Sequence, residues 1–250
     1  MTAFTSTAAY YEALADKEGR LDREGPFLLD VFRRAPGPRV LDMACGVGLH
    51  AAFMAAHGAE VTALDLSQDM VAHASRRRPH PRIFYTVGDM RRLVGEPWDL
   101  ALCLGNSFAL VNTPDEVEDV FHASFAALNP RGLFVAQVVN GAALAYRKPR
   151  HRVERHRIGA EEVVAVKSLV PRDERTLLSL SFFSCSEGQY SSVSETAVLL
   201  RLERDTVLGA AQRAGFDALE VWGGYDRSPF DADLSPDLVC VFGKPSVPGP

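Results

Sequence analysis

The sequence predicts an α/β protein with a doubly wound, mostly parallel seven-stranded sheet and an inserted antiparallel β module. Three observations support this fold class. Short apolar strands alternate with helices from residue 39 to residue 139, as in parallel sheets built with right-handed crossovers. Between residues 150 and 203 the chain changes to consecutive strands with short turns, which is typical of an antiparallel sheet. From residue 204 onward the helix–strand alternation resumes.

The elements of the first half follow from apolar spacing and from local end signals. Helical spacing predicts helices over 7–15 and 24–34, and apolar runs predict strands at 39–42, 60–65, 82–87, 98–104 and 133–139. The run at 98–104 is apolar throughout, as expected of a strand buried on both faces. Ser67 and Thr113 are placed to cap the helices that begin after them.

The second half contains the insertion and the end of the sheet. Strands are predicted at 163–169, 177–184 and 193–202, followed by a helix over 205–214 and strands at 219–225 and 237–242. The basic run at 147–157 is predicted to be a solvated loop, with binding of an anionic acceptor group as the alternative. These elements divide the chain into a helical lid (1–36), a cofactor-binding core (37–149), the β insertion (150–203), the end of the core sheet (204–244) and a tail (245–250).

Composition limits the classes of function. Of the 250 residues 47% are hydrophobic and 24% are charged, which is ordinary for a soluble globular protein. The net charge of −5 gives no reason to expect a nucleic-acid partner. The chain shows no signal peptide and no apolar run long enough for a bilayer, so we expect a cytoplasmic protein without a membrane partner. The four cysteines are too scattered for a zinc site or a disulfide framework, and no metal is predicted.

The turn after the first strand is the main candidate for a cofactor site. Gly46 and Gly48 allow a ligand to approach the backbone, and the following helix presents free N–H groups at the carboxyl edge of the sheet. The turn formally satisfies the dinucleotide fingerprint, with Asp65 roughly twenty positions further on. Asp42, however, adds a negative charge that does not help to bind a pyrophosphate. A carboxylate there suits a cofactor with a cationic amino-acid end, such as S-adenosylmethionine.

The run Val40-Leu41-Asp42-Met43-Ala44-Cys45-Gly46-Val47-Gly48 resembles the first motif of class I S-adenosylmethionine-dependent methyltransferases. This resemblance favours a methyltransferase over a nicotinamide-dependent oxidoreductase. It implies that Asp65 accepts the ribose hydroxyls and that Asp89 accepts from the adenine amino group. The donor site expected from the motifs and the resemblance comprises Tyr11, Arg20, Asp42, Ala44, Gly46, Gly48, Asp65, Leu66, Met70, Gly88, Asp89, Met90 and Leu104.

The segment Leu104-Gly105-Asn106-Ser107-Phe108 is similar to the one that follows the fourth strand in glycine N-methyltransferases and related small-molecule enzymes. In that group an arginine at the position of Arg20 grips the cofactor carboxylate, so the same role is expected here. The resemblance places Tyr10, Asn106 and Ser107 at the reacting groups, and Tyr10 and Tyr11 in a lid. The residues expected at the acceptor are Asn140, Tyr146 and Tyr225.

The histidines bear on the class of acceptor. An oxygen acceptor needs a base to remove its proton, whereas a neutral amine attacks through its lone pair. None of the seven histidines falls in a motif that would fix it at the acceptor. We therefore expect methyl transfer to an amine nitrogen of a small soluble molecule. O- or S-methylation, a nicotinamide-dependent oxidoreductase and a non-catalytic S-adenosylmethionine-binding protein remain alternatives, and a homo-oligomer is compatible with the sequence.

Overall fold

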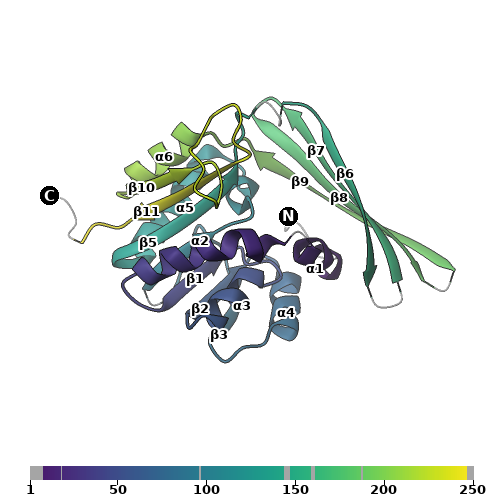
Figure 1. Ribbon diagram of the computed structural model, residues 1–250, viewed down its shortest axis with the longest axis horizontal. Helices are drawn as coiled ribbons and strands as arrows, with labels where there is room; N and C mark the ends of the chain where they lie inside the picture. Colours follow the sequence, from purple (N-terminus) through teal and green to yellow (C-terminus); the bar gives the residue numbers. More distant parts are fainter. Residues whose placement is uncertain are drawn as a thin grey trace.

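The computed structural model describes residues 8–17, 19–95, 97–143, 147–158, 161–186 and 188–246. Its larger sheet has seven strands in the order β10-β11-β5-β4-β1-β2-β3 (Figure 1). The pairs among β3, β2, β1, β4 and β5 are parallel, and β11 is antiparallel to both of its neighbours. The predicted fold class is confirmed. The strands are β1 (Arg39–Met43), β2 (Glu60–Asp65), β3 (Ile83–Val87), β4 (Trp98–Cys103), β5 (Leu128–Val139), β10 (Asp217–Trp222) and β11 (Asp237–Gly243).

Helices cover both faces of this sheet, as the apolar pattern of its central strands requires. One face packs against α5 and α6, and the other packs against α2 and α3. None of the helices in the described part of the chain is both long and apolar enough to cross a membrane. The helices are α1 (Ala8–Lys17), α2 (Arg20–Arg34), α3 (Leu49–Ala56), α4 (Gln68–Arg77), α5 (Pro114–Ala127) and α6 (Arg204–Arg213), with a 3₁₀ turn η1 (Ser107–Leu110).

Several element boundaries differ from the prediction, and three of them have a clear local reason. Helix α2 begins at Arg20 rather than at residue 24, because Gly19 takes the left-handed conformation that starts it. Strand β5 begins at Leu128 rather than at residue 133, since Leu128 already pairs with Trp98. Strand β10 ends at Trp222 rather than at residue 225, because the chain turns back and the backbone N–H of Gly223 donates to the Ser228 carbonyl.

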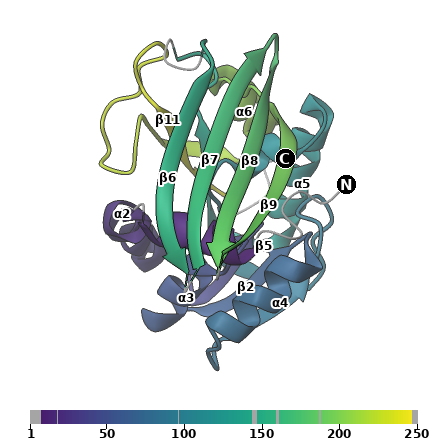
Figure 2. The same ribbon diagram turned by 90° about the vertical axis from the view of Figure 1, so that its right-hand side faces the viewer.

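The insertion forms a separate four-stranded antiparallel sheet in the order β6-β7-β8-β9. The predicted solvated loop at 147–157 is wrong, because residues 150 to 158 form the edge strand β6. Edge strands often carry charged side chains, and these interrupt the apolar alternation by which a strand is recognised in a sequence. Figure 2 shows the four strands side by side in front of the core. They are β6 (Arg150–Ile158), β7 (Glu161–Arg172), β8 (Arg175–Ser186) and β9 (Gln189–Leu200).

This second sheet has two different faces. Its inner face packs against α1, through contacts of Tyr10 and Tyr11 with an apolar cluster, and the sheet arches over that helix (Figure 1). The opposite face exposes large apolar side chains such as Phe183. By alternation along the paired strands, the inner face consists of Arg152, Glu154, His156, Val163, Ala165, Lys167, Leu180, Phe182, Val193 and Glu195.

Candidate functional site

The turn between β1 and α3 is built from three residues in the left-handed conformation. Ala44, Gly46 and Gly48 have φ values of 54°, 54° and 77°. A side chain on Gly48 would place its Cβ 2.8 Å from the Tyr85 hydroxyl, so close packing against β3 requires glycine there. At Gly46 the nearest side-chain atom to a Cβ would be 4.0 Å away, on Tyr11. Space for a ligand therefore lies on the Gly46 side of the turn.

Asp65 holds this turn against the end of β2. One carboxylate oxygen accepts from the Gly46 backbone N–H at 2.8 Å, and the other accepts from the Ser67 N–H at 2.9 Å. Burial raises the pKa of Asp65, and these backbone hydrogen bonds counteract part of that shift. A carboxylate has about four lone-pair positions, so Asp65 retains capacity to accept hydrogen bonds from a bound hydroxyl group.

Asp42 is a buried carboxylate at the end of β1, with 2% of its surface exposed. It accepts a hydrogen bond from the Ala51 N–H, but its Oδ2 atom has no hydrogen-bond partner in the described part of the chain. Burial raises its pKa to about 6, the charge of Asp65 adds to the shift, and His50 opposes it. A buried oxygen without a partner is costly, so this atom indicates that a polar ligand group or a water completes the site.

Glu24 and His50 form a buried pair that sequence reasoning missed. The His50 Nε2 atom lies 2.6 Å from a Glu24 carboxylate oxygen, and each residue is 7% exposed. Arg20, one turn earlier on α2, has its Nε 3.7 Å from the other Glu24 oxygen. The pair joins α2 to the helix after the glycine turn. The available signal was an acid among the apolar residues of α2, which by itself does not identify a partner 26 positions away.

Six of the predicted site residues line one enclosed cavity beside the glycine turn. Its volume of about 40 Å³ is far below the ~300–1,000 Å³ typical of small-molecule sites. Arg20 closes one side, where its guanidinium lies 3.5 Å from the position that a Cβ on Gly105 would take. The cavity is lined by Tyr11, Arg20, Ala44, Cys45, Gly46, Val47, Leu49, His50, Leu104, Gly105 and Ser107.

Helix α1 lies between this cavity and the second sheet. Tyr10 stacks on Phe182 with ring centroids 5.1 Å apart and donates to Glu161 at 3.3 Å. Tyr10 therefore faces the second sheet, whereas Tyr11 reaches both the inner face and the cavity. A cavity this small cannot admit a nucleoside-sized ligand unless α1 or its side chains move.

Glu12 fastens α1 to α4. Its buried carboxylate lies 2.7 Å from His73 Nε2, 2.6 Å from Arg78 Nη1 and 3.2 Å from Arg77 Nε. Burial opposes ionisation of Glu12, but the hydrogen bonds from His73 and Arg78 outweigh it and lower the pKa. The buried charge is therefore well compensated in this closed arrangement.

The predicted adenine side of the site is only partly assembled. Arg91 holds the Asp89 carboxylate through its guanidinium at 2.6 to 3.1 Å, and this hydrogen bonding lowers the Asp89 pKa. Leu66 is 51% exposed, whereas Met70 is only 3% exposed and packs with Ala8 and Val47 in a small apolar cluster. Neither Gly88 nor Met90 lines the cavity, and Met90 packs against the core beside Cys103.

Asn106 and Ser107 differ in what their side chains do. Asn106 adopts a left-handed conformation, and its side-chain oxygen accepts from the Val139 backbone N–H at 2.8 Å. Its own backbone N–H donates to Gln137, whose amide donates to Asp237. Ser107 is buried, donates to the Leu104 carbonyl at 2.8 Å and lines the cavity. Asn106 thus joins β4 to β5, and Ser107 is the member of the pair that reaches the cavity.

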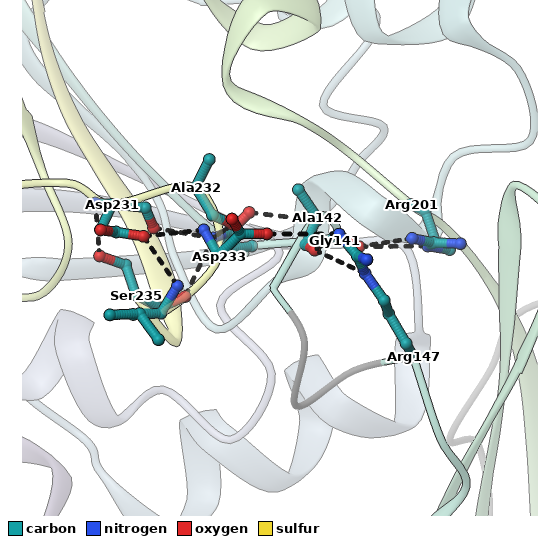
Figure 3. Close-up of polar contacts among 10 residues, drawn as sticks. Gly141, Ala142, Arg147, Arg201, Asp231, Ala232, Asp233 and Ser235 are labelled. Carbon is teal, nitrogen blue, oxygen red and sulfur yellow. Dashed lines mark hydrogen bonds and ion pairs between the residues drawn. The ribbon is translucent and has the colours of Figure 1, made fainter.

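Two of the predicted acceptor residues, Asn140 and Tyr225, do not line this cavity. The Asn140 amide donates to carbonyls of the 231–235 loop, at 2.9 Å for Ala232 and 3.0 Å for Ser235, so it secures the exit of β5. Figure 3 shows neighbouring contacts of that loop, where Arg147 bonds both Ala142 and Asp233 and Arg201 bonds Gly141.

Tyr225 packs edge-on against Phe27, with ring centroids 5.6 Å apart. Its buried hydroxyl has no hydrogen-bond partner among the described residues, and burial raises its pKa well above the usual value. Tyr146, the remaining predicted acceptor residue, lies outside the described residues.

Comparison with known proteins supports the resemblance to methyltransferases. Residues 40–132 match the family model for a methyltransferase domain. The chain is similar to a glycine/sarcosine N-methyltransferase from Halorhodospira halochloris, at 31% identity over 132 residues, 50% of this chain and 48% of the relative. It is also similar to the dTDP-4-amino-2,3,4,6-tetradeoxy-D-glucose N,N-dimethyltransferase of Saccharopolyspora spinosa, at 34% identity over 134 residues, 52% and 53% of the two chains.

The fold is that of a solved amino pentose methyltransferase from Micromonospora echinaspora, with a TM-score of 0.75, 22% identity, and coverage of 94% of this chain and 96% of that one. The predicted resemblance to the class I S-adenosylmethionine-dependent methyltransferases is therefore confirmed. That solved structure holds S-adenosylmethionine, which agrees with the predicted cofactor and not with the alternative of a nicotinamide-dependent oxidoreductase. The chain matches about half the length of these curated methyltransferases.

Proposed function

We propose that this methyltransferase transfers the methyl group of S-adenosylmethionine to an amine nitrogen of a small soluble molecule. The observation that carries the proposal is the convergence of Tyr11, Arg20, Gly46 and Ser107 on one cavity, although they come from four separate parts of the chain. The two curated relatives named above are N-methyltransferases, which agrees with this choice of acceptor atom.

In our assignment, residues of this chain hold the donor, and the donor supplies an electrophilic methyl group. The buried, unpartnered Asp42 oxygen fits a cationic amino group directly or through water. Arg20 has the planar donor geometry that suits the donor's carboxylate. Asp65 would accept from the ribose hydroxyls while it keeps the glycine turn in place. We propose that Asp89 accepts from the adenine amino group, and its carboxylate would then bind Arg91 and adenine at the same time.

We assign catalysis mainly to the alignment of donor and acceptor and to the exclusion of water. His50 is the histidine that lines the cavity, and Glu24 already engages its Nε2 atom. It is therefore poorly placed to take a proton from an oxygen acceptor. An amine needs no strong base during the attack, and this favours nitrogen over oxygen. We propose that Asn106 and Asn140 support the site by positioning strand ends, while Ser107, Tyr10 and Tyr225 contribute polar groups near the acceptor.

Thermal unfolding with added ligands tests the donor assignment. S-adenosylmethionine and S-adenosylhomocysteine at a hundred times their dissociation constants should each stabilise the chain by about 2.7 kcal/mol. NAD and NADP should not shift the transition. An assay for S-adenosylhomocysteine release with a panel of primary amines, alcohols and thiols then tests turnover. Release with an alcohol or thiol but with no amine would overturn the amine assignment, and binding without release from the whole panel would favour a non-catalytic role.

We also propose that α1 acts as a lid that Glu12 keeps closed. Glu12→Gln removes the negative charge that faces His73, Arg77 and Arg78. Hydrogen bonds to charged groups contribute about 1.5–3 kcal/mol each, so S-adenosylhomocysteine should dissociate about tenfold faster or more. Stopped-flow fluorescence measures this rate. Asp22→Asn changes an exposed acid on α2 and is the matched control, so it should leave the dissociation rate unchanged. Equal dissociation rates in wild type and both variants would contradict the proposed role of Glu12.

A further inference from the structure

The inner face of the second sheet carries a row of charged side chains that the proposed donor site does not use. Arg152, Lys167, Leu180 and Glu195 lie directly opposite one another on β6, β7, β8 and β9. Lys167 follows the buried Val163 and Ala165 at the two-residue period of a strand, so it points to the same side as they do. The row therefore lies on the face that packs against α1.

Lys167 is a half-buried cation whose charge is not neutralised. No hydrogen bond or ion pair of its ammonium group occurs within the described ranges of the chain. Its direct neighbour on β6 is Arg152, and like charges directly opposite each other destabilise a sheet. The diagonal acid Glu154 contacts Arg152 and lies 3.2 Å from His156 Nε2, so it is committed elsewhere.

Contacts connect this face to the donor cavity. Tyr11 packs against the apolar cluster of the inner face and also lines the cavity. On the other side, β9 packs against η1, whose Ser107 lines the cavity as well. The inner face thus borders the region next to the donor, where an acceptor of a methyl group has to lie.

We propose that Lys167 and Arg152 form an anion-binding subsite for the methyl acceptor. The subsite would take a carboxylate or phosphate group, because Arg pairs with these groups through its planar fork and Lys through a point charge. This inference rests on the proposed function and narrows it: the acceptor is an amine that also carries an anionic group. The position of Lys167 beside Arg152 then has a reason, because the ligand supplies Lys167 with the negative charge that Glu154, already paired with Arg152, does not provide.

Calorimetric titration of the full chain with two probes, acetate and inorganic pyrophosphate, tests the subsite at constant ionic strength. Lys167→Met keeps most of the length of the side chain and removes its charge, and Arg76→Met, at an exposed cation on α4, is the matched control. At least one probe should bind the wild-type and Arg76→Met chains with the same affinity, and Lys167→Met should weaken binding of that probe about tenfold or more. Acetate binding would indicate a carboxylate, and pyrophosphate binding would indicate a phosphate.

Unfolding of the same variants supplies a second readout. If Lys167 serves a ligand, Lys167→Met relieves repulsion and its melting temperature should equal or exceed that of the wild type. A fall of several degrees would show a structural lysine and overturn the proposal. So would the absence of binding by both probes, or equal binding by all three proteins. Binding of S-adenosylhomocysteine separates the two proposals. If S-adenosylhomocysteine binds but neither anion does, only the anion subsite is wrong. If an anion binds but S-adenosylhomocysteine does not, only the donor site is wrong.

Discussion

Replacing Asp65 by alanine should abolish measurable binding of S-adenosylmethionine, with a loss of at least about a hundredfold. The carboxylate fixes the glycine turn through Gly46 and starts the next helix through Ser67, at 2.8 and 2.9 Å. In our assignment it also accepts from the ribose. Hydrogen bonds to a charged group contribute about 1.5–3 kcal/mol each, so the loss of two or more of them exceeds 2.7 kcal/mol. Calorimetric titration with S-adenosylhomocysteine measures the effect.

Two further variants separate ligand binding from support of the turn. Asp65→Asn keeps one acceptor oxygen, so it should bind more weakly than wild type but more tightly than Asp65→Ala. Asp69→Ala removes an exposed acid four residues later and should leave the affinity unchanged. If Asp65→Ala retains wild-type affinity, the assignment of Asp65 to the donor site is wrong. Far-ultraviolet circular dichroism shows whether each variant remains folded.

Replacing Asp42 by asparagine should stabilise the chain and weaken donor binding in the same protein. Burial raises the Asp42 pKa from 3.8 to about 6, so the native state holds this proton more tightly than the unfolded chain does. The resulting stabilisation is complete below the unfolded-state value and is lost as the pH rises through about 6. At 1.36 kcal/mol per pH unit, the ionised carboxyl costs up to about 3 kcal/mol at neutral pH.

The Asp42→Asn variant has no ionisable group at this position, so its free energy of unfolding lacks this pH dependence. Urea unfolding without ligand should therefore show little difference between wild type and Asp42→Asn near pH 4, with an advantage for the variant that grows and levels off above about pH 6. Affinity for S-adenosylmethionine should fall about tenfold or more, because a neutral amide attracts a cationic amino group less strongly. A variant with unchanged affinity would show that Asp42 does not face the donor. A variant less stable than wild type at pH 7.5 would show that the ionised form is favoured in the fold.

Local patterns were enough to predict the α/β architecture. Apolar runs at the periods of strands and helices, the glycine turn after β1 and the capping residues Ser67 and Thr113 each depend on neighbours a few positions away. The capping predictions hold, since Ser67 accepts from Met70 N–H and Thr113 from Glu116 N–H, both at 3.3 Å. The charged strand β6 escaped prediction because its pairing partner β7, rather than its own composition, makes it a strand.

The class of fold and the position of the glycine turn could be predicted from the sequence, because both are encoded in short-range periodicity and in the backbone freedom of Gly46 and Gly48. Which polar groups meet depends instead on how distant segments of the chain pack. That packing pairs Glu24 with His50, fastens Glu12 to α4 and turns Lys167 toward α1. Such contacts join residues far apart in the chain, and their strength depends on burial, which arises only once sheets and helices have packed.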